Sequence, residues 1–220
     1  NGTKNLLDYA QTSRTQSVLL ASSLEVYGTI TDDSTPLTEE AQGYLDPMAV
    51  RSSYPMAKRA AETLCHDYAK EYGTHAKVAR LAQTFGAGVA QDDTRVFAQF
   101  ARSIIKSEDI VMHTKGELCR SYCYTTDAIA AMLYILLRGK DGEAYNVANE
   151  TTYISIKDMA TFLAETFNPR VKVVVELKEN MGYSPTTKLR LSTDKVRQLG
   201  WTPQYGLQEM FHRLIESLKQ

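Results

Sequence analysis

A tyrosine and a lysine four residues apart, Tyr54 and Lys58, are the side chains of this chain best suited to chemistry. In a helix this spacing places two side chains next to each other. An ammonium beside a phenol favours the ionised phenolate, so the pair can act as a general base. Exposed residues of ordinary amphipathic helices also show this spacing, and the pair alone leaves both interpretations open.

The residues around this pair predict a helix that begins at Tyr54. Pro55 suits the first turn, where its missing N–H leaves no bond unmade. Apolar and small residues then recur at helical spacing: Ala57, Ala60, Ala61, Leu64, Cys65 and Tyr68. Gly73 is a typical end for such a helix. Arg59 is expected to be a solvated residue on its surface.

Upstream, a short apolar run ends in two serines. Residues 18–21 predict a buried strand, after which Ser22 and Ser23 begin a site loop. A hydroxyl at this place can hydrogen-bond a substrate, although small polar residues also occur commonly at strand ends. Residues 29–50 are polar and predict a loop between the serine strand and the tyrosine helix.

Taken together, these motifs resemble the extended short-chain dehydrogenase/reductase family that acts on nucleotide sugars. That family carries a Ser or Thr at the position of Ser23, then Val-Tyr-Gly as in residues 26–28, then Tyr-x-x-x-Lys as in residues 54–58. The resemblance extends over the whole chain through three further segments: 80–86, 120–127 and 142–147.

The resemblance implies an α/β fold, namely the C-terminal part of a Rossmann-like doubly wound parallel sheet with a smaller α/β substrate-binding subdomain. Residues 1–88, with contributions from about 120–150, are expected in the NAD-binding domain. Residues 89–119 and 150–220 are expected in the subdomain. The resemblance also implies NAD as cofactor and a homodimer, built on apolar surface of the first helix and the tyrosine helix: Leu6, Leu7, Ala10, Ala60, Ala61 and Leu64.

The glycine-rich turn with which this family binds the cofactor pyrophosphate does not occur in the sequence. Gly86 and Gly88 form the only close glycine pair, but polar residues 91–93 follow them and no helix opens directly. We therefore expect the chain to lack the family's N-terminal glycine-rich part. By itself it is expected neither to bind NAD tightly nor to turn over a sugar.

The resemblance assigns catalytic and cofactor-binding roles to individual residues. Tyr54 would take the proton of a sugar hydroxyl while hydride leaves the same carbon for NAD. Ser23 would hydrogen-bond both the sugar and the Tyr54 oxygen. Lys58 would support the phenolate and bind the nicotinamide ribose, and Tyr54 and Ser22 would also contact the cofactor.

Further residues are expected to bind a nucleotide-diphosphate sugar. Gln83 stands where the family usually has an asparagine, and it keeps the amide but not the geometry. Arg120 matches a diphosphate-binding arginine, whose planar fork suits phosphate oxygens; the alternative is an ordinary surface arginine. Lys188 or Arg190 is expected as a second phosphate contact.

Leu24 and Glu25 bear on the reaction. Related dehydratases have an Asp-Glu pair at this position and related decarboxylases a Ser-Glu pair, whereas leucine cannot transfer a proton. Residues 45–54 and 58–64 are nevertheless most similar to the decarboxylase subgroup. We predict an epimerase, with decarboxylase and dehydratase as alternatives and a non-catalytic nucleotide-sugar-binding protein as an alternative of another class. Glu25 is either a second acid/base or a carboxylate that orders the loop.

Composition excludes several other classes of protein. The net charge of −1 gives no electrostatic reason for binding nucleic acid or a membrane. No apolar run reaches the ~20 residues of a spanning helix, and no signal-peptide pattern occurs at the start. The three cysteines predict reduced thiols in a cytoplasmic protein. The spacing of cysteines and histidines predicts no metal site.

The remaining hydrophobic pattern predicts alternating strands and helices. Strands are expected at residues 77–85, 110–112, 144–147 and 171–176. Helices are expected at residues 96–105 and at 127–137, the second with Thr125 or Thr126 as its cap. A third helix is expected to begin at the capping box of Ser155 and Asp158. The last apolar stripe predicts a helix at 207–218.

Overall fold

The computed structural model describes residues 1–178 and 186–220. Its helices and strands are, in chain order, α1 (Gly2–Thr12), β1 (Val18–Ser23), the 3-10 helices η1 (Leu24–Tyr27) and η2 (Val50–Ser52), α2 (Ser53–Tyr72), β2 (Ala76–Leu81), β3 (Gln83–Phe85), α3 (Val96–Lys106), β4 (Ile110–Met112), β5 (Cys119–Tyr124), α4 (Thr125–Arg138), β6 (Ala144–Val147), β7 (Asn149–Ser155), α5 (Ile156–Phe167), β8 (Val173–Val175), β9 (Lys188–Leu189), α6 (Asp194–Arg197) and α7 (Leu207–Leu218).

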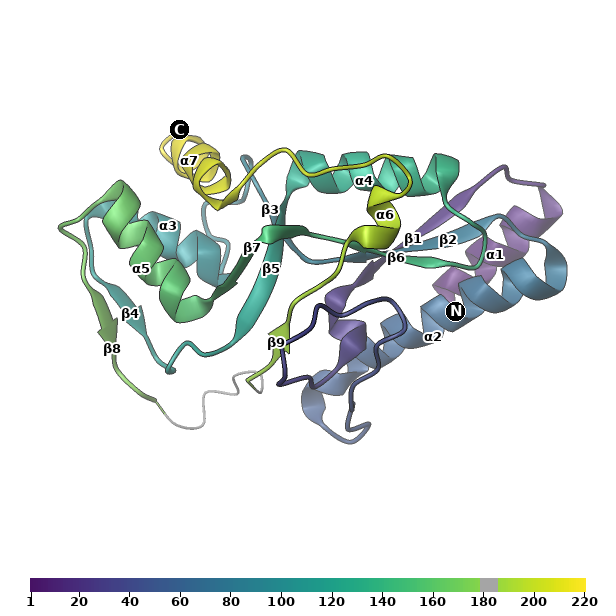
Figure 1. Ribbon diagram of the computed structural model, residues 1–220, viewed down its shortest axis with the longest axis horizontal. Helices are drawn as coiled ribbons and strands as arrows, with labels where there is room; N and C mark the ends of the chain where they lie inside the picture. Colours follow the sequence, from purple (N-terminus) through teal and green to yellow (C-terminus); the bar gives the residue numbers. More distant parts are fainter. Residues whose placement is uncertain (179–185) are drawn as a thin grey trace.

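A parallel sheet in the order β1-β2-β6 forms one part of the molecule. Successive side chains of a strand point to opposite faces. In β2, Val78 therefore packs with residues of α1 and α2, whereas Ala79 packs with residues of α4. Helices α1 and α2 cover one face of this sheet and α4 covers the other (Figure 1). This layering confirms the predicted α/β class with a parallel sheet.

The second part has its own strands and its own core. One sheet has the order β3-β5-β7 with β9 beside β5, and β4 pairs with β8. Helices α3, α5 and α7 gather at this end of the molecule (Figure 1). They surround an apolar cluster that includes Phe85, Phe97, Met159 and Phe211, each at most 1% exposed.

The single strand predicted at residues 77–85 is wrong, because the chain changes sheets at Ala82. Strand β2 ends at Leu81 and pairs with β1 and β6, whereas β3 begins at Gln83 and pairs with β5. The Ala82 amide still donates to the Val147 oxygen at 2.9 Å. An extended apolar run indicates a strand, but it does not show which neighbours each half will pair with.

Two predicted helix caps had different outcomes. The capping position at Ser155 is confirmed, since its hydroxyl accepts from the Asp158 amide at 3.0 Å. The cap at Thr125 or Thr126 is wrong. Helix α4 begins at Thr125 itself, and the side chain of the capping residue, Tyr124, makes no capping hydrogen bond.

Several expectations about composition can be compared with the described residues. There, no helix combines the length and apolar character needed to cross a membrane, and no group of side chains could hold a metal ion. Cys65, Cys119 and Cys123 are free thiols, as predicted. Residues 179–185 of the predicted subdomain lie outside the described residues, and the predicted domain boundaries remain a prediction.

We predict that Phe85→Ala destabilises the fold by about 3–5 kcal/mol, because a large core ring is removed without replacement. Phe85 is 1% exposed, and its ring centroid lies 4.4 Å from that of Phe97 and 4.9 Å from that of Phe211. Urea denaturation measures the change. Leu133→Ala, at a 52% exposed position of α4, is the control and should change stability by at most about 0.5 kcal/mol. Equal effects of the two variants would contradict this packing role.

Candidate active site

A cleft lies at the carboxyl ends of β1 and β2, where parallel sheets commonly bind ligands. Its volume of about 590 Å³ is within the range of small-molecule sites. The residues that line it are Ser22, Ser23, Leu24, Glu25, Arg51, Ser53, Tyr54, Pro55, Leu81, Ala82, Gln83, Thr84 and Arg95. The cleft thus brings together five residues predicted from sequence as site residues: Ser22, Ser23, Glu25, Tyr54 and Gln83.

Tyr54 and Lys58 lie side by side on the first turns of α2, as their spacing predicts. The Lys58 Nζ is 5.7 Å from the centroid of the Tyr54 ring. It also donates to the backbone oxygen of Ala21 at 2.7 Å, which ties the helix to β1. The Tyr54 side chain is 52% exposed and therefore accessible from the cleft. The predicted end of this helix is confirmed, since Gly73 has the left-handed φ of 66°.

Ser23 ends β1 and begins the turn η1. Its hydroxyl accepts from the Glu25 amide at 3.2 Å. The Glu25 side chain is 41% exposed, and its Oε1 lies 4.0 Å from the Arg120 Nη2. Gly28 follows η1 with φ of 71°, and a Cβ there would meet the Tyr44 oxygen at 2.5 Å. The Val-Tyr-Gly motif thus provides a turn that brings Ser23 and Glu25 to the cleft.

Arg120 lies beside the cleft in a neighbouring hollow that it shares with Glu25 and Thr187. Its Nη1 donates to the Thr187 hydroxyl at 2.5 Å and to the Cys119 oxygen at 3.2 Å. Burial lowers the pKa of the Arg120 guanidinium. Only 5% of Arg120 is exposed, so the alternative of an ordinary surface arginine is wrong.

Lys188 and Arg190, the two other predicted phosphate contacts, are not among the described residues that line the cleft. The Lys188 ammonium lies 3.1 Å from a carboxylate oxygen of Asp33. That carboxylate also accepts from the Tyr153 hydroxyl at 2.8 Å. Arg190 is exposed, and its backbone oxygen accepts from the Leu37 amide.

A row of polar side chains crosses the parallel sheet directly behind the cleft. Ser22, Arg80 and Asn146 are register partners on β1, β2 and β6. Partners in adjacent parallel strands point to the same face, which is the face covered by α2. Glu62 of α2 lies over this row and accepts from the Ser22 hydroxyl at 2.5 Å. Ser22, predicted as a cofactor contact, thus uses its hydroxyl hydrogen in a hydrogen bond to Glu62.

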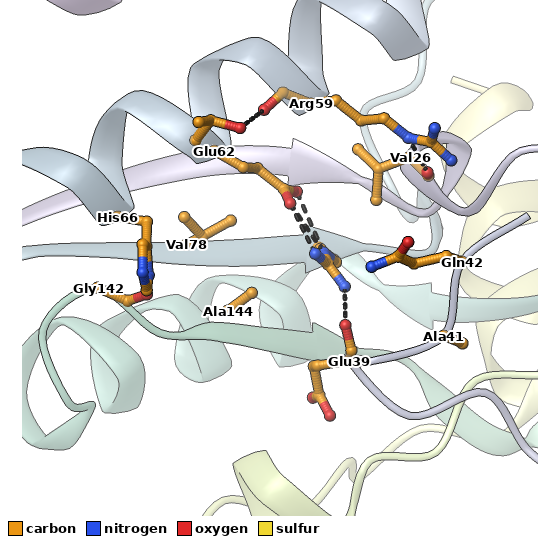
Figure 2. Close-up of a pocket in the computed structure, with 12 residues that line it drawn as sticks. Val26, Glu39, Ala41, Gln42, Arg59, Glu62, His66, Val78, Gly142 and Ala144 are labelled. Carbon is orange, nitrogen blue, oxygen red and sulfur yellow. Dashed lines mark hydrogen bonds and ion pairs between the residues drawn. The ribbon is translucent and has the colours of Figure 1, made fainter. Parts of the chain in front are cut away.

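Arg80 and Glu62 form a nearly buried ion pair. The Arg80 Nη2 donates to Glu62 Oε2 at 2.8 Å, and Nε lies 3.1–3.2 Å from both carboxylate oxygens. The side chains are 15% and 10% exposed. Burial lowers the pKa of Arg80, but its bonds to Glu62 outweigh this effect and raise the pKa. Figure 2 shows Glu62 extending from α2 toward these bonds.

The same guanidinium reaches the turn that follows Ser23. The Arg80 Nη1 donates to the Tyr27 hydroxyl at 3.1 Å and to the Glu39 backbone oxygen at 2.6 Å. The Tyr27 hydroxyl in turn donates to Asn146 Oδ1 at 2.7 Å. Burial raises the pKa of Tyr27 to about 12. Tyr27 is therefore a neutral hydrogen-bond donor in this network, not a base.

The expectation that Arg59 is a solvated surface residue is wrong. Its Nε donates to the Val26 oxygen at 2.7 Å and its Nη2 to the Gly43 oxygen at 2.8 Å. Arg59 thus fastens the turn η1 and the 29–50 loop to α2. Figure 2 shows its side chain reaching from the helix toward Val26. Helical spacing could not reveal this role, because the two acceptors are backbone atoms outside the helix.

Sequence reasoning also missed four residues around the cleft: Arg51, Glu62, Arg80 and Arg95. Arg51 lines the cleft, the hollow that contains Arg120, and a third hollow between Val96 and Leu118. The Arg95 guanidinium lies 2.6 Å from Asp93 and borders the cleft as well. One signal was available for Glu62, which is four residues after Lys58 and thus on the same helix face.

The cleft residues fit the reacting end of a dinucleotide cofactor better than its phosphates. Ser23 and Tyr54 supply hydroxyl groups to the cleft, and the Lys58 ammonium lies next to the Tyr54 ring. A pyrophosphate would need a glycine-rich turn that leads into a helix. In residues 1–178 and 186–220 no such turn occurs, and helix α3 after the Gly86–Gly88 pair begins only at Val96.

The fold defines a Rossmann-type α/β protein, and Ser23 and Tyr54 line the cleft at its strand ends. The model of the NAD dependent epimerase/dehydratase family matches residues 1–148, and the chain belongs to this family. UDP-glucuronic acid decarboxylase 5 of Arabidopsis thaliana is 31% identical over 208 residues, which are 94% of this chain and 59% of that protein. UDP-glucuronic acid decarboxylase 6 of the same plant is 32% identical over 210 residues, again covering 94% and 59%. The chain thus spans about 59% of the length of these curated relatives.

Solved structures agree on the fold. UDP-glucose 4-epimerase of Thermotoga maritima superposes with a TM-score of 0.83 at 22% identity, over 99% of this chain and 68% of that chain. dTDP-glucose 4,6-dehydratase of Bacillus anthracis, solved with NAD, superposes with a TM-score of 0.80 at 18% identity, over 99% and 66%. These comparisons confirm the predicted family and its NAD dependence. The relatives include decarboxylases, epimerases and dehydratases, so they do not select one reaction.

Proposed function

We propose that this chain forms the catalytic and substrate-binding part of an NAD-dependent enzyme that oxidises a nucleotide sugar transiently, usually at C4, and epimerises it. This proposal is carried by Ser23 and Tyr54, which line one cleft, together with Lys58, whose Nζ lies 5.7 Å from the centroid of the Tyr54 ring. The substrate is a nucleotide-diphosphate sugar, not a nucleic acid or a membrane. The free thiols support a cytoplasmic location.

In the proposed mechanism, Tyr54 removes the proton of the sugar hydroxyl, and Ser23 holds that hydroxyl in line. Lys58 keeps a positive charge beside the phenol oxygen. NAD, when bound, supplies the acceptor for the hydride that leaves the same carbon. Epimerisation then requires the keto sugar to present its opposite face for the return of the hydride, while Tyr54 gives its proton back to the sugar oxygen.

Leu24 supports epimerisation over the two alternatives. It is 2% exposed and packs in an apolar cluster with Val26 and Leu37, so this position of the cleft wall offers no transferable proton. Glu25 beside it can act as an acid/base or orient Arg120. The decarboxylase alternative is supported by the identity to the Arabidopsis decarboxylases. A non-catalytic nucleotide-sugar-binding protein is the alternative of another class.

We predict that Tyr54→Phe in the complete protein lowers turnover by about 10²-fold or more, because the ring remains but the proton acceptor is lost. The assay supplies NAD with UDP-glucose or UDP-glucuronic acid. Its products separate the reactions: a 4-epimer, released CO₂, or a dehydrated keto sugar. Tyr72→Phe, at a 54% exposed position near the far end of α2, is the control.

Turnover of Tyr54→Phe within about threefold of the parent would exclude the assigned base. Binding of both sugars without any product would favour the non-catalytic alternative.

We predict that Arg120→Ala weakens nucleotide-sugar binding more than it slows the chemical step. A group that holds an unreacting diphosphate contributes equally to ground state and transition state. Calorimetry gives the affinity, and single-turnover kinetics at saturating substrate give the chemical rate. Arg120→Lys, which retains charge but not the fork, should fall between parent and Ala. A slowed chemical step with intact affinity would contradict this role.

We propose a homodimer through α1 and α2, on a revised surface. Leu7 and Ala10, predicted as contact residues, point inward and are 0% and 3% exposed. The outer face of α1 instead presents Leu6 and Tyr9, at 57% and 69% exposure. Helix periodicity showed an apolar stripe but not that it faces this chain's own core.

Leu6→Glu combined with Tyr9→Glu is predicted to convert the dimer to a monomer, because charges would be buried at the contact. Sedimentation of the complete protein at micromolar concentration measures this. Leu137→Glu, at a 78% exposed position of α4, is the control and should leave the dimer intact. A parent protein that sediments only as a monomer would contradict the proposal.

A further inference from the structure

We propose that Glu62 and Arg80 are positioning residues of the cleft: their ion pair sets the register between the helix that carries Tyr54 and the strand that carries Ser23. The inference rests on the proposed function of the cleft. Neither residue lies among the described residues that line the cleft. Both line a hollow of about 410 Å³ beneath α2, seen in Figure 2.

Helix α2 contacts two consecutive residues of β1 through polar bonds. Lys58 donates to the Ala21 backbone oxygen at 2.7 Å, and Glu62 accepts from the Ser22 hydroxyl at 2.5 Å. Lys58 and Glu62 are one helical turn apart, so both bonds lie on the same face of α2. The next residue of β1 is Ser23. These bonds therefore fix the helix directly beside the serine.

The ion pair extends this attachment to a second strand and to the turn. The Arg80 fork holds the Glu62 carboxylate through Nε and Nη2, which leaves Nη1 for Tyr27. Tyr27 belongs to η1, the turn that also contains Glu25. One guanidinium thus connects the helix of Tyr54 with the turn that follows Ser23. Charged forks of this kind are more directional than apolar contacts.

Apolar packing cannot replace this constraint near the cleft. The buried residues of α2 are Pro55, Glu62, Cys65 and Tyr68. Cys65 and Tyr68 pack with Leu7 in an apolar cluster at the far half of the helix. In the half near the cleft, Glu62 is thus the buried side chain after Pro55. A slip by one residue would move the helix by about 1.5 Å, and a misplacement of about 1 Å can cost on the order of 10² in rate.

The test uses Glu62→Gln in the complete protein, assayed with NAD and whichever of UDP-glucose and UDP-glucuronic acid it turns over. Glutamine keeps the shape and an acceptor for Ser22, but it removes the charge that holds the Arg80 fork. We expect kcat to fall about 10- to 100-fold and KM to stay within about threefold, since the substrate contacts remain. The Arg80→Lys variant retains the charge without the fork, and its kcat should lie between that of the parent and that of Glu62→Gln.

Asp141→Asn is the matched control. It makes the same carboxylate-to-amide change in another ion pair of β2, where Asp141 lies 2.6 Å from Lys77 at the opposite end of the strand. Its kcat should stay within about twofold of the parent. The Asp141 side chain is 37% exposed and its ion pair with Lys77 involves neither α2 nor η1, so a loss of register would slow only Glu62→Gln.

Hydrogen exchange without substrate gives a readout independent of activity. In Glu62→Gln, amides of η1 and of the first turns of α2 should exchange at least about tenfold faster, and those of α4 should not change. If Tyr54→Phe retains activity, the proposed function fails. The exchange pattern then still shows whether the Glu62–Arg80 pair sets the register between α2 and β1. Unchanged exchange, or a kcat of Glu62→Gln within about twofold of the parent, overturns the inference. If Glu62→Gln does not fold, the same criteria apply to Arg80→Lys.

Discussion

The ion pair between Arg80 and Glu62 joins the strand, the helix and the turn from which the candidate active site is built. Desolvating two charges is costly, and a buried pair is tolerated only when its other hydrogen bonds are made. Here they are made, because Ser22, Tyr27 and the Glu39 backbone satisfy the remaining groups. The pair therefore adds direction to a helix–sheet contact that apolar side chains alone would leave free to shift.

A second constraint comes from the parallel sheet. Parallel strands deliver their carboxyl ends to one edge, so the ends of β1 and β2 place Ser23 and Leu81 in the same cleft, and Gln83 follows there as the first residue of β3. The change of sheet at Ala82 then leads the chain into the second part, where Phe85 is buried in the core. The cleft thus lies where the chain passes from one sheet to the other.

Most of the elements could be predicted from the sequence, since each depends on local periodicity. The tyrosine helix, its end at Gly73 and the cap at Ser155 were predicted correctly. The errors have a common cause. Periodicity could not show that β2 and β3 belong to different sheets, that Leu7 faces inward, or that Arg59 binds backbone oxygens of a loop. Each of these depends on a partner distant in the chain.

The sequence by itself determined which residues we propose for the site. Helix geometry places residues four apart side by side whatever surrounds them, which singles out Tyr54 and Lys58, and the family resemblance adds Ser23. Only the tertiary structure decided what holds these residues in position. Ser22, Glu62 and Arg80 meet because parallel pairing aligns Ser22 with Arg80 and packs α2 over both. Register and packing are set by the whole sheet, which no short segment of the chain encodes alone.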